Sequence, residues 1–153
     1  MDIGAGTGEK AAMLLRESPG AEVYAVDPNP KKIAEAQRAH PGVKSSVAGA
    51  EKLPFDDAFF DKAYSTMALH HFVDLDRALQ EVVRVLKPGG TFVVMEIEPG
   101  SAAGRLFRLM AGLMGERVRM LTESQLEAEL GSKSLRVLQT RRGSRYFVQA
   151  VRP

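Results

Sequence analysis

Short hydrophobic runs alternate along this chain with segments whose apolar residues recur at helical spacing. The sequence therefore predicts strands over residues 21–26, 43–48, 61–65 and 91–97, and helices over residues 8–17, 30–39 and 76–86. Strands that alternate with helices are typical of βαβ units, in which the strands lie parallel. We predict an α/β fold built on a doubly wound, mostly parallel sheet.

The pattern changes after residue 100. Residues 102–114 form an amphipathic segment rich in Leu, Met and Phe, which suits a lid over an apolar acceptor, a dimer surface or ordinary core packing. Two arginines in this segment also allow a helix at a membrane surface. The capping-box spacing from Thr122 to Gln125 then predicts a short helix that ends near residue 130.

The end of the chain has the pattern of an antiparallel hairpin. Residues 135–141 and 145–151 are strand-like, and residues 142–144 form the turn between them. We expect this hairpin to add antiparallel strands to the sheet. The whole chain, residues 1–153, is then a single domain in which residues 101–131 form a helical cap or insertion.

Composition narrows the class of protein. With 153 residues, 44% hydrophobic and 26% charged, the chain suits one ordinary globular domain. A formal charge of +2 is too small to predict a nucleic-acid partner. The absence of cysteine excludes disulfides, thiolate metal sites and cysteine nucleophiles, and we expect no metal. The longest apolar runs have the length of strands, so we expect no membrane span and a cytoplasmic protein.

A glycine-rich turn at the start of the chain carries the first chemical indication. Gly4, Gly6 and Gly8 allow the backbone to approach a ligand closely, and the helix that follows offers unpaired N–H groups. Asp27 lies 19 residues after Gly8, at the end of the next predicted strand, where a carboxylate can bind ribose hydroxyls. The spacing predicts an adenosine-containing cofactor. The structural alternative is a tight turn with a helix-capping aspartate.

Further motifs follow in order along the chain: Ala50-Glu51-Lys52-Leu53-Pro54-Phe55, Ala68-Leu69-His70-His71, and the run from Glu81 to Gly90 that ends in Lys-Pro-Gly-Gly. With the glycine turn and Val26-Asp27, these motifs resemble the class I S-adenosylmethionine-dependent methyltransferases, in particular the branch often called methyltransferase type 11. The resemblance covers residues 2–96. Members of that family carry a helical segment and a hydrophobic first strand before the turn, whereas this sequence starts at the turn.

The resemblance implies a binding site for S-adenosylmethionine formed by Asp2, Gly4, Ala5, Gly6, Asp27, Pro28, Ala50, Glu51 and Ser65. In that site Asp2 braces the turn and Asp27 accepts hydrogen bonds from both ribose hydroxyls. Backbone groups of the Ala-Glu pair meet the adenine edge. Ser65 lines the methionine end of the cofactor and the entrance to the acceptor site.

His70 and His71 are the only cluster of titratable side chains near this expected site. An unperturbed histidine has a pKa near 6.5, so either ring suits a general base that accepts a proton from the acceptor. The alternative is structural, with one ring packed inward as a loop anchor and the other solvated. Methyl transfer is compatible with that alternative, because the sulfonium methyl is already activated and positioning supplies much of the acceleration.

The resemblance implies methyl transfer from S-adenosylmethionine to an oxygen, nitrogen or carbon nucleophile of a small molecule. Two alternatives stay open. A nicotinamide-dependent oxidoreductase uses a similar turn and acid, although the spacing Gly-x-Gly-x-x-Gly is not met. A truncated or degenerate methyltransferase fold would act as a non-catalytic binding or regulatory subunit. A homodimer or a partner chain that completes the sheet is also expected from the short first strand.

Overall fold

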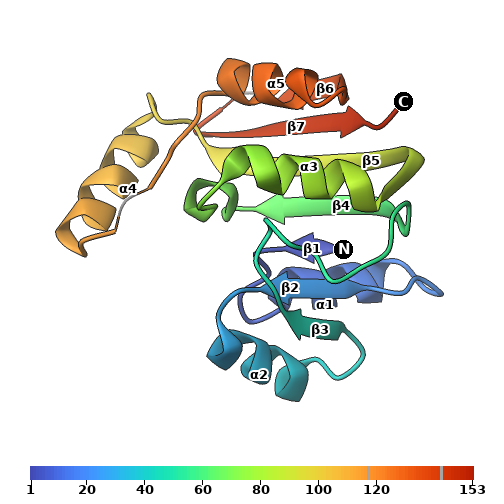
Figure 1. The fold of residues 1–153 in the computed structure, drawn as a ribbon. Coiled ribbons are helices and arrows are strands. Elements are labelled where there is room, and N and C mark those ends of the chain that lie inside the picture. The colour runs from blue at the N-terminus through green and yellow to red at the C-terminus, as the bar shows by residue number, and fades with distance from the viewer. Residues whose placement is uncertain (117, 142) are drawn as a thin grey trace.

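The structure is a computed structural model that describes residues 1–116, 118–141 and 143–153. Its centre is a seven-stranded sheet in the order β3-β2-β1-β4-β5-β7-β6 (Figure 1). The strands are β1 (Asp2–Ile3), β2 (Tyr24–Asp27), β3 (Lys44–Val47), β4 (Phe60–Thr66), β5 (Leu86–Ile97), β6 (Arg136–Arg141) and β7 (Arg145–Val151). The first five strands in this order pair parallel, whereas β7 lies antiparallel to both β5 and β6. The predicted fold class is confirmed.

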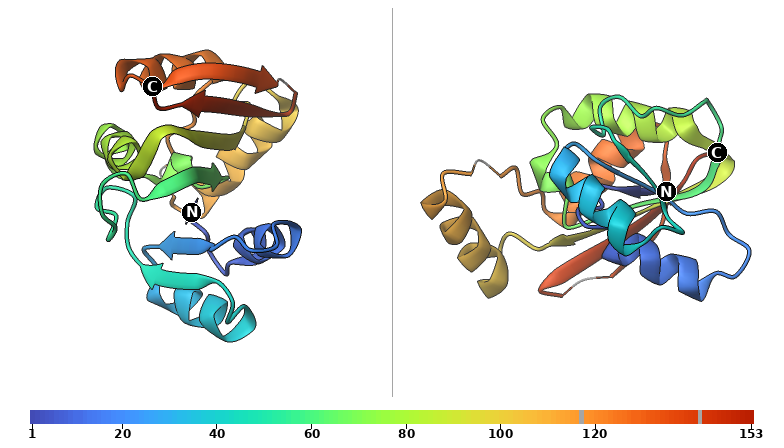
Figure 2. Two further views of the ribbon diagram at one scale, coloured as in Figure 1. Left: turned by 90° about the vertical axis from the view of Figure 1, so that its right-hand side faces the viewer. Right: turned by 90° about the horizontal axis from the view of Figure 1, so that it is seen from below.

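Helices cover both faces of the sheet. They are α1 (Glu9–Glu17), α2 (Pro30–Ala39), α3 (Leu75–Val85), α4 (Ala102–Leu113) and α5 (Glu123–Ser132), with a short 3₁₀ helix, η1 (Leu69–His71). Helices α3 and α5 lie on one face and α1 lies on the other (Figure 2). Helix α4 stands apart, at the end of the sheet toward which the arrow of β4 points (Figure 1).

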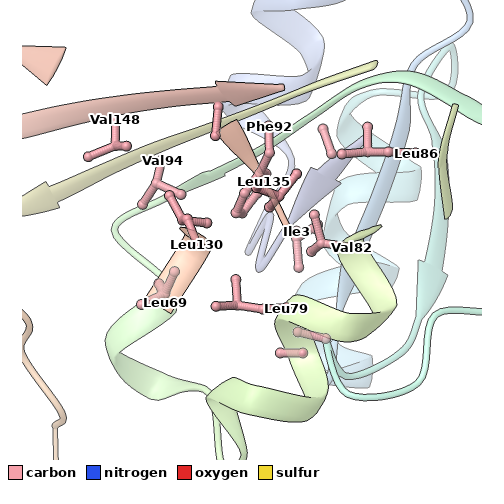
Figure 3. Close-up of a cluster of buried hydrophobic side chains, with 14 of the residues drawn as sticks. Ile3, Leu69, Leu79, Val82, Leu86, Phe92, Val94, Leu130, Leu135 and Val148 are labelled. Atoms are coloured by element: carbon pink, nitrogen blue, oxygen red, sulfur yellow. The ribbon is translucent and has the colours of Figure 1, made fainter. Parts of the chain in front are cut away.

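The main core lies between the sheet and the pair α3 and α5. Figure 3 shows how Leu79 and Val82 of α3 meet Phe92 and Val94 of β5, and all four side chains are fully buried. The period of apolar residues in α3 explains this contact, because positions three and four apart share one helix face. A smaller cluster that includes Ala11 and Ala12 packs α1 against the other face of β2.

Strand β1 is only two residues long, yet it occupies the centre of the parallel half. Asp2 pairs with Ala25 of β2 and with Tyr64 of β4, and Ile3 pairs with Val26. The glycine turn therefore follows directly from a buried strand. The sequence pattern did not predict this strand, because two residues are too few to show a period.

The start of β5 differs from the prediction. The strand begins at Leu86 instead of residue 91, and its register with β4 shifts between Phe60 and Lys62. Gly89 has a φ of +78° and donates its N–H to the carbonyl of Arg152, so the expected Lys-Pro-Gly-Gly turn is an irregularity inside the strand. The turn of the final hairpin includes residue 142, which lies outside the described residues.

Over one part of the sheet, the described residues place no helix. On the face opposite α3, Tyr64, Val93, Met95 and Phe147 line a cavity of about 940 Å³ beside Met13 of α1. Parallel strands are normally covered on both faces, so this surface suits a further segment or chain. The expected homodimer or partner chain stays a prediction.

Candidate active site

The three glycines of the first turn have left-handed backbone conformations and three different surroundings. A Cβ added at Gly4 would lie 2.4 Å from the Cβ of Ala68, so the turn and the loop after β4 approach closely. A Cβ at Gly8 would lie 3.1 Å from the Cβ of Ala36, where α1 packs on α2. A Cβ at Gly6, whose φ is +56°, would have no atom within 4 Å. Gly6 is therefore the glycine that borders open space.

Asp27 lies beside this open position and is held by two backbone donors. Its Oδ2 accepts the N–H of Gly6 at 2.9 Å, and its Oδ1 accepts the N–H of Asn29 at 2.9 Å. The side chain is buried, with 6% of its surface exposed. Each carboxylate oxygen has a second acceptor position, so a fixed Asp27 can still bind a pair of hydroxyls. The turn is anchored to the same strand, because Gly4 and Ala5 both donate to the carbonyl of Val26.

Asp2 lies under the turn in β1 and is almost fully buried. Burial raises the pKa of its carboxyl to about 7, the amino terminus of Met1 lowers that pKa, and the Asp27 carboxylate raises it further. Among the described residues, Asp2 Oδ2 has no hydrogen-bond partner. An acceptor in this state favours either a proton or a donor group supplied by a ligand.

The loop between β3 and β4 borders the site from the other side. Ala50 is buried, whereas the side chain of Glu51 turns toward α3 and accepts the N–H of Val73 at 2.8 Å. Arg84 of α3 holds the same loop, because it donates to the carbonyls of Leu53 at 3.0 Å and Phe55 at 2.7 Å. The backbone of residues 50 and 51 thus has a fixed position through side chains that face away from the crevice.

Arg84 also binds Glu81, as expected for a structural pair. Its Nε lies 2.8 Å from Glu81 Oε1, and Glu81 Oε2 accepts the N–H of Leu53. The guanidinium lowers the pKa of Glu81 through this hydrogen bond. The pair connects α3 to the loop and has no contact with the glycine turn among the bonds described.

The carboxyl end of β4 brings two further residues to the site. Ser65 is fully buried, and its Oγ has no hydrogen-bond partner in the described part of the chain. Met67 follows with a φ of +54°, a conformation that is rare for a residue with a side chain, and it donates its N–H to the carbonyl of Met95 at 2.8 Å. Such strained residues gather at functional sites.

His70 is paired with a buried glutamate from the next strand. Its Nδ1 lies 2.7 Å from Oε2 of Glu96, and Oε1 of Glu96 accepts the N–H of Leu69 at 2.8 Å. His70 and Glu96 are 4% and 5% exposed. The ring of His70 also meets the edge of Phe107 of α4, with centroids 5.0 Å apart. The pair fixes η1 against β5 and α4.

His71 is exposed, and its ring centroid lies 4.3 Å from that of His70. Partial burial lowers the pKa of His71, and the neighbouring His70 lowers it further. Glu116 after α4 raises this pKa, and Lys32 at the start of α2 lowers it. Charged groups from the segment after α4 and from the first turn of α2 therefore both act on His71.

The structure brings the predicted cofactor residues to one end of the sheet. Asp2, Gly4, Ala5, Gly6, Asp27 and Pro28 lie in or directly after β1 and β2, and Ser65 lies at the end of β4. Sequence reasoning missed Glu96 and the strained backbone of Met67, and it included Phe107 only as part of the apolar segment 102–114. For Glu96 a signal was present, because a charged residue occupies an inward position in the alternation Phe92, Val94, Glu96.

The crevice suits the cofactor that this arrangement implies. Gly6 leaves room that a side chain would fill, and the buried acceptors of Asp2 and Ser65 have no partner within the described residues. Asp27 is held in one orientation by the backbone N–H groups of Gly6 and Asn29. An adenosine with a charged amino-acid tail offers donors of the kind that these atoms lack.

Comparison with known proteins agrees with this geometry. The chain is 38% identical over 115 residues to a demethylmenaquinone methyltransferase of Thermus thermophilus, which covers 71% of this chain and 52% of the relative. It is 33% identical over 132 residues to a phthiotriol/phenolphthiotriol dimycocerosates methyltransferase of Mycobacterium ulcerans, covering 85% of this chain and 48% of the relative. The chain thus spans about half the length of these relatives.

A solved structure supports the fold. A methyltransferase from Thermotoga maritima, named a possible histamine N-methyltransferase, superposes with a TM-score of 0.85 over 99% of this chain and 80% of that chain, at 23% identity. The family model described as a methyltransferase domain matches residues 1–94. This family and fold imply S-adenosylmethionine as the cofactor. The chain belongs to the class I S-adenosylmethionine-dependent methyltransferase family.

Proposed function

We propose that this chain transfers a methyl group from S-adenosylmethionine to an oxygen, nitrogen or carbon nucleophile of a small lipophilic molecule. The observation that carries the proposal is the open position at Gly6, directly beside the fixed carboxylate of Asp27. A nicotinamide cofactor would also use a glycine turn and an acid, but the matched family and the motif spacing favour the methyl donor.

The cofactor, when bound, supplies a methyl group that is already activated by a sulfonium. The residues of the chain hold the cofactor and exclude water. Asp27 binds the ribose hydroxyls, and the backbone of Ala50 and Glu51 borders the adenine edge. Ser65 and Asp2 offer buried acceptors to the methionine end. Fixing the reacting groups in line is the main contribution expected of such a site.

We place the acceptor beside η1 and α4. Helix α4 follows β5, and its Phe107 contacts His70 at the end of the sheet. We propose residues 101–131 as a cap over the acceptor, because α4 and α5 are inserted between β5 and the final hairpin. The names of the two relatives denote a quinone and a lipid as acceptors, which supports a lipophilic molecule here.

The two histidines take different roles in this proposal. His71 is exposed, and its lowered pKa keeps the ring neutral near pH 7, so we assign it as the general base that accepts a proton from the acceptor. His70 is buried and acts as a positioning residue. Glu96 holds His70 at Nδ1, which fixes the ring and the short helix that carries both histidines.

The histidine roles have separate signatures. In His71→Ala, kcat falls and the acidic limb of the pH profile disappears, while the affinity for S-adenosylhomocysteine is unchanged. Glu96→Gln keeps the shape and one acceptor oxygen, and it reduces kcat while the acidic limb remains. If His71→Ala keeps the wild-type profile, His71 is not the base and positioning alone accounts for the rate.

Calorimetry tests the proposed function. We expect S-adenosylhomocysteine to bind and NAD⁺ not to bind under the same conditions. Transfer of a labelled methyl group from S-adenosylmethionine to lipophilic phenols, hydroquinones and amines in detergent then tests turnover. Binding of NAD⁺ alone would refute the methyl donor. Binding of S-adenosylhomocysteine with no turnover on any acceptor would favour the non-catalytic binding subunit instead.

A further inference from the structure

Helix α4 carries the densest group of exposed apolar side chains among the described residues. Ten large hydrophobic residues are exposed in the described part of the chain. Five of them lie between residues 106 and 114: Leu106 (60%), Leu109 (60%), Met110 (49%), Leu113 (74%) and Met114 (66%). The other five are scattered over β3, β6, β7 and two loops. Single exposed apolar residues are ordinary, whereas a continuous patch marks an interaction surface.

The apolar patch faces outward because the opposite face of α4 is anchored. A Cβ at Gly104 would lie 2.2 Å from the carbonyl oxygen of Glu98, so the helix starts in tight contact with the turn before it. Ser101 caps the helix and accepts the N–H of Gly104 at 2.9 Å. Phe107 then contacts His70, and Ala111 is buried. Rotation of α4 to bury its patch would break these contacts.

Within α4 the charges have one sign, whereas Glu98 and Glu116 lie just beyond its two ends. Residues 99–115 include Arg105 and Arg108, both exposed, and no Asp or Glu. At 100° per residue the two arginines lie side by side along one edge of the apolar arc. A helix with an apolar face and a basic edge binds at the interface of a lipid bilayer, where the arginines reach the phosphates. With 12 residues α4 is short, and no helix of the described residues is long and apolar enough to cross a membrane.

We propose that α4 docks on the surface of an anionic lipid bilayer, with its apolar patch among the acyl chains and its arginines at the headgroups. A second copy of this chain fits the patch less well, because a symmetric contact between two α4 helices brings four arginines together and the helices themselves contain no acid. Because α4 stands at the end of the sheet toward which β4 points, docking brings that end of the sheet to the bilayer (Figure 1).

The benefit of this arrangement rests on the proposed function, since a lipophilic acceptor would be dissolved in the bilayer. The docking itself does not depend on the cofactor or on turnover. Binding to vesicles is therefore measured without either, and methyl transfer is measured separately in detergent. Failure of one measurement leaves the other interpretable.

The test is sedimentation with vesicles of equal parts phosphatidylglycerol and phosphatidylcholine, compared with pure phosphatidylcholine. We expect binding to the anionic vesicles that weakens with salt. Leu109→Gln with Leu113→Gln should weaken it about tenfold or more. The matched control, Val47→Thr with Leu138→Thr, removes apolar side chains of similar exposure, 52% and 47%, and should leave binding unchanged.

Charge is tested in the same way. Arg105→Gln with Arg108→Gln should weaken binding to anionic vesicles by about fivefold per arginine, whereas Arg16→Gln with Arg38→Gln, two exposed arginines of α1 and α2, should have little effect. Circular dichroism confirms that each variant is folded. The proposal is overturned if the folded wild type does not bind, if the leucine variant binds equally well, or if sedimentation velocity finds a dimer that this variant dissociates.

Discussion

Replacing Gly6 by alanine separates an effect on cofactor affinity from an effect on the stability of the turn. Gly6 has a φ of +56° and open space where a Cβ would lie. Alanine in this left-handed conformation costs about 1–2 kcal/mol, and the stiffer unfolded chain offsets about 0.4–1 kcal/mol of that cost. The net loss of stability is therefore about 1 kcal/mol, which lowers Tm by roughly 2–4 °C in a domain of this size.

Gly20 provides the matched control. It has a φ of +84°, again with no atom within 4 Å of an added Cβ, and it lies in the turn between α1 and β2. Gly20→Ala therefore carries the same backbone penalty. Only Gly6→Ala places a methyl group where the cofactor should lie, and overpacking of this kind costs about 1–3 kcal/mol, or roughly tenfold to a hundredfold in affinity.

The assay combines thermal unfolding with calorimetric titration of S-adenosylhomocysteine. Both variants should lose a similar few degrees in Tm, while only Gly6→Ala loses affinity and the stabilisation that the ligand provides. Equal affinity in the two variants would refute the assignment of Gly6 to the cofactor crevice. A much larger loss of stability in Gly6→Ala would show that the position is packed instead of open.

Three further predictions concern stability. Folding raises the Asp2 pKa from 3.8 to about 7, so the folded state favours the protonated carboxyl. This contribution to the free energy of unfolding is lost as pH rises from 3.8 to about 7. In urea unfolding, Asp2→Asn should flatten the dependence of this free energy on pH by up to about 4 kcal/mol. Arg84→Lys should cost about 1–3 kcal/mol by releasing buried loop carbonyls, whereas Lys87→Met, which removes an exposed ion pair, should cost less than about 1 kcal/mol. Tyr146→Phe should cost about 1–3 kcal/mol, because it leaves the carbonyl of Leu121 without its 3.0 Å hydrogen bond. An unchanged denaturation midpoint in Arg84→Lys or in Tyr146→Phe would contradict the stabilising role given to that side chain.

Local chemistry in the sequence was enough to predict much of the fold. Asn29 followed by Pro30 is a residue pair typical of a helix start, and the side chain of Asn29 accepts the N–H groups of Lys31 and Lys32. The capping box at Thr122 is also present. Such features depend on residues two or three apart, so the sequence contains all the information that they need.

Contacts between distant residues were beyond the same reasoning. His70 and Glu96 are 26 residues apart, and only the parallel pairing of β4 with β5 brings them within 2.7 Å. The outward direction of α4 depends on Gly104 against Glu98, a close approach that no period in the sequence indicates. The early start of β5 depends on a bond from Gly89 to the last residues of the chain.

The predictable features of the site lie in the part of the chain that matches the family, and the unpredictable contacts involve residues beyond it. The family match ends at residue 94, within β5, and everything assigned to the cofactor lies before that point. Glu96 and Phe107 lie beyond it, yet both contact His70, which lies inside the matched part. Under the proposed function, the acceptor site spans this boundary: the part shared with the family would hold the methyl donor, and β5 and α4 would set what approaches it. Changes of acceptor should arise from substitutions after residue 94 that leave cofactor affinity intact.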